Sequence, residues 1–334
     1  MAANLRSHPD LLALSAGDIG AVLKPRVCLD ALREAYAALH SDTGARPSSV
    51  ELRAARGTFH VKAGMEPGRR EVLAAKLNAN FPRNPEKGLP TIQGVLLLFD
   101  ATNGTPLAMM DSGELTAWRT AAATALAAIH GACSQSRTAT IIGCGRQAAH
   151  QLAAIADVLP LETIYAVDSA PDRSRAFAAR QEGLLNLDIL PVADPADATL
   201  ASDVILTCTT ASKPVLTPAM TRAGTFIAAV GADNPRKQEL DPALFRGAAV
   251  IVDDFDACAR NGELFHALEA KTIRPEQVRA DLAALAADAG TGRASTEEIV
   301  IYDSVGVGIQ DVAVAKAAWR AAVANGKGVR LSLD

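Results

Sequence analysis

A short glycine motif is the first place in the sequence where residue types and spacing indicate chemistry. The segment 143–148, Gly-Cys-Gly-Arg-Gln-Ala, directly follows the apolar, β-branched stretch 138–142. Gly143 permits a tight turn, Gly145 lets a pyrophosphate approach the backbone, and the small Ala148 lets a following helix pack against the strand. A helix that starts here would also present its free N–H groups and positive dipole end to phosphates. The pattern predicts a dinucleotide site, and the alternative is an ordinary structural turn.

An acidic residue strengthens the first interpretation. Asp168 ends the next predicted strand, 163–167, close to the expected spacing of about 20 residues after the glycine turn. Its carboxylate would accept hydrogen bonds from ribose hydroxyls and repel a 2′-phosphate, which favours NAD over NADP. Arg173 and Arg175 lie downstream and could reach a 2′-phosphate, so NADP stays the less favoured alternative.

Two later strand ends carry polar residues. Thr209 follows the predicted strand 203–207, and Asp233 follows the predicted strand 226–230. Ligands of parallel sheets bind at the carboxyl ends of the strands, where a hydroxyl could touch a cofactor and a carboxylate could exchange a proton with an amine or water. The alternatives are a β-branched strand end for Thr209 and turn chemistry for Asp233, which precedes Asn and Pro.

The first third of the chain supplies cations suited to a carboxylate ligand. Arg46, Lys62, Lys76 and Arg119 lie near predicted strand or loop ends, and His60 would share a strand face with Lys62. Taken singly, most such residues are solvated. Arg119 differs because it starts an Ala-rich helix that is expected to be buried, where an arginine needs an anionic partner.

The elements that must position these residues fall into two groups. The first 130 residues predict a helical region over about 16–40 that breaks near Pro25 and is capped by Ser15, then strands and an Ala-rich helix over 114–130. The apolar–polar alternation of the strands predicts a mostly antiparallel sheet joined by hairpins. These strands are expected at 50–52, 58–62, 74–77, 94–99 and 106–110.

From residue 138 onward, strands alternate with helices, which predicts a parallel, doubly wound sheet. The expected strands are 138–142, 163–167, 203–207, 226–230, 249–252 and 299–302. The expected helices are 147–159, 173–182, 276–289 and 311–325.

Composition narrows the class of protein. The chain has 334 residues, of which 49% are hydrophobic and 21% charged, so two globular domains are expected. The net charge of -4 argues against binding to nucleic acid. No apolar run approaches the roughly 18 residues that span a membrane, and no signal peptide is expected. Scattered cysteines without a CxxC pair favour a cytoplasmic protein, and isolated histidines favour no metal site.

As an ordered set, these motifs resemble the ornithine cyclodeaminase/mu-crystallin family, which includes archaeal-type alanine dehydrogenases. The stretches that carry the resemblance are 88–91, 115–121, 142–147, 230–233, 237–240, 302–306 and 309–311. The resemblance implies an α/β fold in which a Rossmann NAD-binding domain, 129–303, is inserted into an α+β substrate-binding and dimerisation domain made of 1–128 and 304–334. It also implies a homodimer whose substrate-domain sheets meet at the interface.

The resemblance further implies roles for individual residues. Arg46, Lys76 and Arg119 would hold the substrate carboxylate, Val305 would contact the substrate, and Asp233 would be the general acid/base, with Lys76 beside it in catalysis. The residues implied to line the cofactor are Thr91, Arg119, Gly143, Gly145, Arg146, Gln147, Ala148, Asp168, Thr209, Val230, Lys237 and Ser304.

The shared chemistry of the family implies hydride transfer between nicotinamide and the Cα of an amino or imino acid. One departure concerns His60 and Lys62, because ornithine cyclodeaminases proper carry Glu and Met on that strand. A His and a Lys favour neutral or anionic substrate groups over a second amine. The reactions left open are those of a cyclodeaminase, an alanine dehydrogenase, a cyclic ketimine (pyrroline-carboxylate) reductase and an opine-type synthase, and a non-catalytic nucleotide- and ligand-binding protein is the other alternative.

Overall fold

The computed structural model describes residues 10–42 and 48–333 and divides into two compact units. Unit 1 comprises Met1–Arg119 with Gly308–Asp334, and unit 2 comprises Thr120–Val307. The first division falls inside helix α3 (Ser112–Gly131), and the second falls at the start of helix α10 (Gly308–Ala324). The sequence placed these boundaries after residues 128 and 303. The role assigned to each domain stays a prediction.

Unit 1 begins with two helices whose limits follow from local chemistry. Ser15 caps α1 (Ala16–Val22) through a capping box, in which its Oγ accepts from the backbone N–H of Asp18 at 3.2 Å. The Asp18 carboxylate accepts from the backbone N–H of Ser15 in return. Helix α2 (Pro25–Ser41) starts at a proline, which lacks the N–H that a first-turn residue leaves unpaired. The predicted cap and the predicted break are both confirmed.

A seven-stranded sheet forms the body of unit 1, in the order β17-β1-β6-β5-β4-β3-β2. Every neighbouring pair is antiparallel except β1 and β6, which confirms the predicted kind of sheet. The strands are β1 (Leu11–Leu14), β2 (Ser48–Ala54), β3 (Gly57–Met65), β4 (Val72–Asn80), β5 (Ile92–Asp100), β6 (Pro106–Asp111) and β17 (Val329–Leu331), with the short helix η1 (Asn84–Lys87) between β4 and β5. The sequence missed β1 and β17, which are short.

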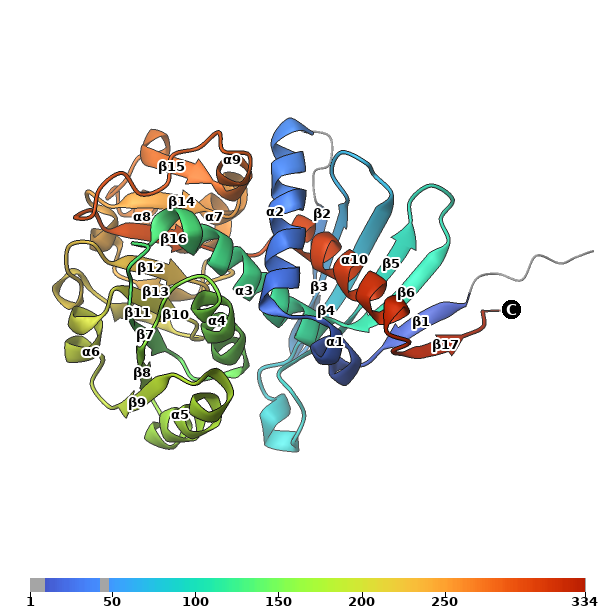
Figure 1. The fold of residues 1–334 in the computed structure, drawn as a ribbon, viewed down its shortest axis with the longest axis horizontal. Coiled ribbons are helices and arrows are strands. Elements are labelled where there is room, and N and C mark those ends of the chain that lie inside the picture. The colour runs from blue at the N-terminus through green and yellow to red at the C-terminus, as the bar shows by residue number, and fades with distance from the viewer. Residues whose placement is uncertain (1–9, 43–47, 334) are drawn as a thin grey trace, which may run out of the picture. The chain divides into compact units, whose positions relative to one another are not determined.

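The two faces of this sheet differ. Helix α10 lies across β3, β4 and β5, as Figure 1 shows, and it covers buried side chains such as Leu96 and Leu98. The alternate residues point to the other face, where Val50, Leu77 and Val95 are more than 40% exposed. The strand registers place these three in one row across the sheet. An apolar row of this kind on a sheet face is typical of an interface.

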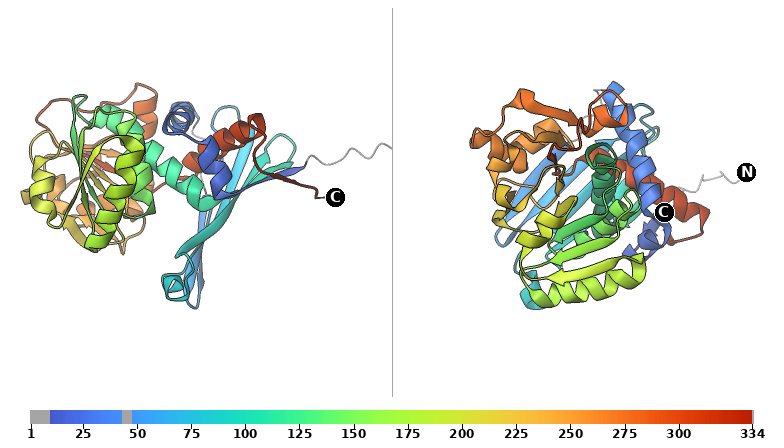
Figure 2. Two further views of the ribbon diagram at one scale, coloured as in Figure 1. Left: turned by 60° about the horizontal axis from the view of Figure 1, so that its bottom comes forward. Right: turned by 60° about the vertical axis from the view of Figure 1, so that its left-hand side comes forward.

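Unit 2 contains an eight-stranded sheet in the order β15-β14-β16-β12-β10-β7-β8-β9, with every neighbouring pair parallel. Helices cover both faces (Figure 2), so the predicted doubly wound Rossmann-type sheet is confirmed. The strands are β7 (Thr138–Ile142), β8 (Thr163–Val167), β9 (Asp188–Val192), β10 (Val204–Thr207), β12 (Phe226–Ala229), β14 (Ala249–Val252), β15 (Val278–Asp281) and β16 (Val300–Asp303). The order of the strands reverses between β7 and β10, where ligands of such sheets bind.

Smaller elements connect these strands. The helices are α4 (Arg146–Ala156), α5 (Pro171–Leu185), α6 (Pro195–Ala201), α7 (Phe255–Asn261), α8 (Glu263–Glu269) and α9 (Leu282–Ala286), with short turns η2 (Pro218–Met220), η3 (Pro242–Phe245) and η4 (Pro275–Gln277). A separate two-stranded sheet pairs β11 (Ser212–Leu216) with β13 (Gln238–Leu240).

One predicted helix is wrong in its first half. Residues 276–289 contain η4 and strand β15 before the five-residue helix α9. The side chains of Val278 and Ala280 alternate with polar ones, and β15 pairs with β14 at the edge of the sheet. The hydrogen bonds of that edge therefore override the helical propensity of the alanines. Within the described ranges, no helix is both long enough and apolar enough to cross a bilayer.

Candidate active site

The glycine turn lies between β7 and α4, as the motif predicts. Gly143 has a φ of +97°, and a Cβ there would lie 2.8 Å from the carbonyl oxygen of Cys208. Only glycine therefore fits between the ends of β7 and β10. Gly145 caps α4 without a side-chain hydrogen bond, and a Cβ at this position would meet nothing within 4 Å. Ala148 is fully buried against the sheet.

These properties fit a pyrophosphate. The start of α4 offers backbone N–H groups beside a residue without a side chain, so an anion can approach the backbone closely. Arg146 is exposed and Gln147 is partly buried in the first turn of the same helix. The turn, Arg146 and Gln147 thus occupy the positions that the sequence assigned to the cofactor, and their role stays a prediction.

Asp168 follows β8 and holds the glycine turn in place. Its Oδ2 accepts from the backbone N–H of Cys144 at 2.9 Å, and its Oδ1 accepts from the backbone N–H of Ala170 at 2.9 Å. The Arg173 guanidinium lies 3.9 Å away, and Arg175 pairs with Asp172 instead. The carboxylate therefore holds the glycine turn, one of the two arginines is engaged elsewhere, and the contact of Asp168 with a ribose stays a prediction.

A tight turn follows β12 and carries Asp233. Its carboxylate forms a 2.8 Å ion pair with Lys237, and Lys237 also donates to the carbonyl of Gly231 at 3.2 Å. The backbone N–H of Lys237 donates to the carbonyl of Asn234 and closes the turn. The Asp233 side chain is 54% exposed, so it can meet a substrate. The predicted Asp233 and Lys237 are thereby brought together, and Val230 lies at the end of β12 beside them.

Ser304 and Val305 follow β16, the next strand of the sheet. Ser304 Oγ donates to the Asp253 carboxylate at 3.2 Å, and the backbone N–H of Gly306 donates to the same carboxylate at 2.7 Å. Val305 is buried between them. Thr209 follows β10 on the other side of β12. The predicted residues of unit 2 therefore gather at the carboxyl ends of β7, β8, β10, β12 and β16.

Three buried carboxylates lie at the same edge of the sheet. Glu239 accepts from Thr209 and Gly231, and Glu263 accepts from Glu239 and Leu240 through their backbone N–H groups. Asp303, at the end of β16, accepts from the backbone N–H groups of Glu263 and Leu264. Burial raises the pKa of Glu239, and raises that of Glu263 to about 9 and that of Asp303 to about 7. Within the described ranges none of the three forms an ion pair.

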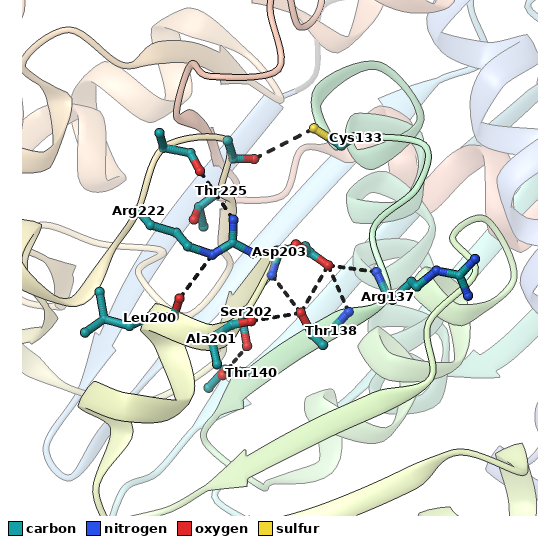
Figure 3. A network of polar contacts seen from close by, with 12 residues as sticks. Cys133, Arg137, Thr138, Thr140, Leu200, Ala201, Ser202, Asp203, Arg222 and Thr225 are labelled. Atoms are coloured by element: carbon teal, nitrogen blue, oxygen red, sulfur yellow. Dashed lines mark hydrogen bonds and ion pairs between the residues drawn. The ribbon is translucent and has the colours of Figure 1, made fainter.

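The opposite edge of the same sheet is organised by a carboxylate with a cationic partner. Figure 3 shows Asp203, which precedes β10 and accepts from the backbone N–H of Arg137, from Thr138 and from the Arg222 guanidinium. The Arg222 guanidinium is 2.5 Å away. Burial acts to raise the pKa of Asp203, but the hydrogen bonds that this carboxylate accepts hold its pKa below the ordinary value.

Unit 1 contains a buried cluster in which two cations share one carboxylate. Lys76 Nζ on β4 lies 2.8 Å from both carboxylate oxygens of Asp311, in the first turn of α10. Arg119 Nε on α3 lies 3.4 Å from the same carboxylate. All three side chains are at most 8% exposed. Two positive charges beside one negative charge leave a net charge that a second carboxylate would neutralise.

Neighbouring side chains fix this cluster. Arg119 Nη1 donates to Gln310 Oε1 at 2.7 Å, and Gln310 donates to the hydroxyl of the buried Tyr36 at 2.8 Å. Burial lowers the pKa of Lys76 to about 8, and Arg119 and Lys62 act in the same direction, whereas Asp311 opposes them. The pKa of Asp311 is lowered by Lys76 and Arg119 against the effect of burial.

The remaining predicted residues of unit 1 behave differently from one another. Lys62 lies directly opposite Lys76 across β3 and β4. His60 lies two residues along β3, and its ring nitrogens face Thr58 at 3.0 Å and Glu51 at 3.9 Å. Thr91 precedes β5, and its carbonyl accepts from Phe81. Arg46 lies outside the described residues.

The sequence missed two residues that organise these clusters. Asp311 is the anionic partner that a buried Arg119 requires, and an acidic residue among the apolar positions of the last helix was the signal for it. Glu239 lies in the stretch 237–240, which carries part of the family resemblance, but its partners Thr209 and Gly231 lie 30 and 8 positions away in the sequence. No group of three or more potential metal ligands gathers in the part of the chain that the structure describes.

The sequence is similar to known proteins over almost its whole length. Residues 12–325 match the ornithine cyclodeaminase/mu-crystallin family. An alanine dehydrogenase of Archaeoglobus fulgidus is 32% identical, covering 96% of this chain and 98% of the relative. An iminosuccinate reductase of Paracoccus denitrificans is 31% identical, covering 97% and 100%.

Two solved structures are similar over almost the whole chain. The Δ1-pyrroline-2-carboxylate reductase of Thermococcus litoralis, in complex with NADH and L-proline, has a TM-score of 0.91 at 29% identity and covers 96% of this chain and 99% of its own. An archaeal alanine dehydrogenase dimer with bound NAD has a TM-score of 0.90 at 31% identity and covers 97% and 100%. The predicted family and fold class are confirmed.

Proposed function

The chain belongs to the ornithine cyclodeaminase/mu-crystallin family, and we propose that it is an NAD-dependent oxidoreductase acting at the Cα–N bond of an amino or imino acid. At the level of the family this prediction is confirmed, because its relatives include an alanine dehydrogenase and a pyrroline-carboxylate reductase solved with NADH. The observation that carries the proposal is the buried Lys76–Asp311–Arg119 cluster, whose excess positive charge suits an α-carboxylate.

The cluster does the positioning work of the reaction. Lys76 and Arg119 bind the carboxylate and so present Cα in a fixed orientation, which lowers the barrier of such a transfer. Asp233 takes the proton as the amine becomes an imine, and returns it in the reverse direction. When bound, NAD supplies the hydride acceptor at its nicotinamide. The glycine turn, Arg146, Gln147 and Asp168 would hold its pyrophosphate and ribose.

Within the family, the strand β3 favours net oxidation or reduction over cyclodeamination. Lys62 lies directly opposite Lys76 on the neighbouring strand, and its positive charge acts to lower the pKa of Lys76. A second substrate amine would add a positive charge to this surface, whereas a neutral or anionic side chain would not. We therefore propose a dehydrogenase or imine reductase that consumes its nicotinamide cofactor.

Substoichiometric NAD tests this choice with a panel of amino acids. A dehydrogenase forms NADH in an amount equal to the substrate oxidised and stops when NAD is exhausted. Full conversion of ornithine to proline without accumulation of NADH would instead identify a cyclodeaminase. Asp233→Asn separates catalysis from ligand binding, since loss of turnover with retained NADH binding supports an enzyme.

Two glycine variants test the cofactor site. Gly145→Ala places a methyl group in open space at the start of α4, so the fold is retained while NADH binding, followed by its fluorescence, weakens at least tenfold. Gly143→Ala is the matched variant, because its Cβ collides with the backbone of β10 and the protein is destabilised. Wild-type NADH affinity in Gly145→Ala would show that the pyrophosphate does not bind at this turn.

We also propose that the protein is a cytoplasmic homodimer. The apolar row of Val50, Leu77 and Val95 on the open face of the unit 1 sheet supports an interface, and the similar alanine dehydrogenase structure is a dimer. Leu77→Lys puts a charge in the middle of the row and is expected to shift the mass in light scattering from dimer to monomer. An unchanged dimer would place the interface elsewhere.

A further inference from the structure

We propose that Glu239 is a positioning residue for the active site, whose buried carboxylate fixes the turn that carries Asp233 against the strand end that carries Thr209. The inference rests on the proposed function, since it concerns the geometry of that same reaction. The proposed reaction does not by itself call for such a residue, because Glu239 takes no direct part in hydride or proton transfer.

The contacts of Glu239 span two neighbouring strand ends. Its Oε1 accepts from the backbone N–H of Thr209 at 2.6 Å, after β10. Its Oε2 accepts from the backbone N–H of Gly231 at 2.7 Å, after β12, and from the Thr207 hydroxyl at 2.9 Å. One side chain therefore fixes the distance between the two segments that the sequence assigned to cofactor contact and proton transfer.

The turn between Gly231 and Glu239 is closed on itself by these contacts. Glu239 ends the turn in sequence and binds its first residue through space, with Asp233 between them. Lys237 reinforces the closure through Asp233 and the carbonyl of Gly231. Position 231 requires glycine, because a Cβ would lie 2.4 Å from the carbonyl oxygen of Thr209 and 2.5 Å from Glu239 Oε1. The Thr209 backbone and the Glu239 carboxylate together occupy the space that a side chain at position 231 would need.

Two further buried carboxylates support Glu239 from behind. Glu263 accepts from the backbone N–H groups of Glu239 and Leu240, at 2.6 and 3.1 Å, and so fixes the strand that carries Glu239. Asp303 accepts from the backbone N–H groups of Glu263 and Leu264, at 3.1 and 2.9 Å. Asp303 directly precedes Ser304. The series therefore links the segment after β16 to the turn that carries Asp233 through side chains that are at most 1% exposed.

The chemistry of this arrangement distinguishes it from a structural ion pair. Three donors converge on the carboxylate of Glu239, and within the described part of the chain no cation pairs with it. A carboxylate in such a place costs desolvation, and its hydrogen bonds repay only part of that cost. The opposite edge of the sheet shows the ordinary solution, in which Asp203 pairs with Arg222 (Figure 3).

The variant Glu239→Gln keeps the shape of the side chain and removes its charge. The amide NH₂ group cannot accept, so at least one of the three donors loses its partner. We expect kcat to fall 10- to 100-fold and the Kd of NADH to rise about 3- to 10-fold, because the turn and the Thr209 segment move. The KM for the amino acid should change less than threefold, since its carboxylate is held in unit 1.

Asp203→Asn is the matched control. It too removes a charge that accepts backbone N–H groups in the same sheet, but at the opposite edge. Its unfolding transition should shift as much as that of Glu239→Gln, while kcat and the Kd of NADH stay within twofold of wild type. Equal losses of kcat in the two variants would show a general structural effect and overturn the proposal, as would wild-type kcat and Kd in Glu239→Gln.

A gentler variant decides the matter if Glu239→Gln does not fold. Thr207→Val removes one donor to Glu239 and leaves both backbone contacts in place. A fall in kcat of at least threefold with unchanged KM for the amino acid supports the positioning role, and unchanged kcat and Kd overturn it. The proposed function fails separately, if the wild-type protein turns over no amino or imino acid with NAD or NADH.

Discussion

The two units solve the problem of buried charge in opposite ways. In unit 1, Asp311 lies between Lys76 and Arg119, and these two cations hold its pKa low. In unit 2, Glu239, Glu263 and Asp303 accept from backbone N–H groups and, at Glu239, also from a hydroxyl, and burial raises their pKa values. The first cluster leaves an excess positive charge for a ligand, whereas the carboxyl groups of the second hold the backbone of neighbouring loops.

This difference teaches that burial alone does not identify a binding site. Both clusters are almost inaccessible to solvent, but only the cations of unit 1 carry donors suited to an incoming carboxylate. The carboxylates of unit 2 instead accept hydrogen bonds from N–H groups of their own chain.

Removal of the shared carboxylate in unit 1 should have the largest effect. Asp311→Asn leaves Lys76 and Arg119 buried beside one another without an anion, so the free energy of unfolding should fall by about 3–5 kcal/mol. Urea denaturation at pH 7 measures this loss. At pH 9 the loss should shrink, because Lys76, whose pKa is already about 8, can release its proton.

The exposed pair of Arg26 and Asp30 provides the control for that measurement. Asp30→Asn removes a carboxylate from a surface ion pair of the same unit, at a cost of about 0.3–0.5 kcal/mol. Equal effects of the two substitutions would show that the Asp311 cluster is no more than an ordinary surface pair.

The carboxylates of unit 2 should make the protein less stable as the pH rises. Glu263 has a folded pKa of about 9 and an unfolded value near 4.5, so between these values the folded state holds a proton that the unfolded state has released. The free energy of unfolding then falls with rising pH, by at most about 1.4 kcal/mol per pH unit for one proton. Denaturation between pH 5 and 8 measures the slope.

Glu263→Gln removes this group and should flatten the slope between pH 5 and 8. The remaining slope would then come from Asp303, whose pKa of about 7 places its contribution below neutral pH. An undiminished slope in Glu263→Gln would mean that Glu263 stays ionised in the folded protein, and the contrast with Asp311 would be lost.

Ligand binding to unit 1 should weaken above pH 8. Lys76 attracts a carboxylate only when it is protonated, and its folded pKa is about 8, so affinity should fall by up to about tenfold per pH unit above that value. A 2-oxo acid used as a competitive inhibitor measures this, because it has no amine that titrates in the same range. In Lys76→Arg the decline should disappear, and its persistence there would assign it to another group.

The charge of Lys62 should have the smallest effect, on selectivity alone. Lys62→Gln should raise kcat/KM for ornithine relative to alanine about two- to fivefold, since one partly solvated charge interaction is worth about 0.2–1 kcal/mol. His60→Gln on the same strand is the comparison, and it should change the ratio less, because His60 faces Thr58 and Glu51. A larger shift from His60→Gln would reverse these two roles.

The sequence predicted most of the elements and the glycine turn between β7 and α4, because these depend on contacts close along the chain. The glycine turn, the Ser15 cap and the break at Pro25 each follow from the conformational limits of one or two residues. Residues 276–289 and the short strands β1 and β17 could not be predicted in this way. Their structure depends on hydrogen bonds to strands far away in the chain, which periodicity does not reveal.

The tertiary structure decided how the charged residues are used. The sequence by itself determined that a buried Arg119 needs an anionic partner and that position 143 needs a residue without a side chain. Only the fold brought Asp311 to Lys76 across 235 positions, and Glu239 to Thr209 and Gly231. The physical reason is that a charge can be buried only where its partners converge, and convergence is a property of packed strands and helices rather than of spacing.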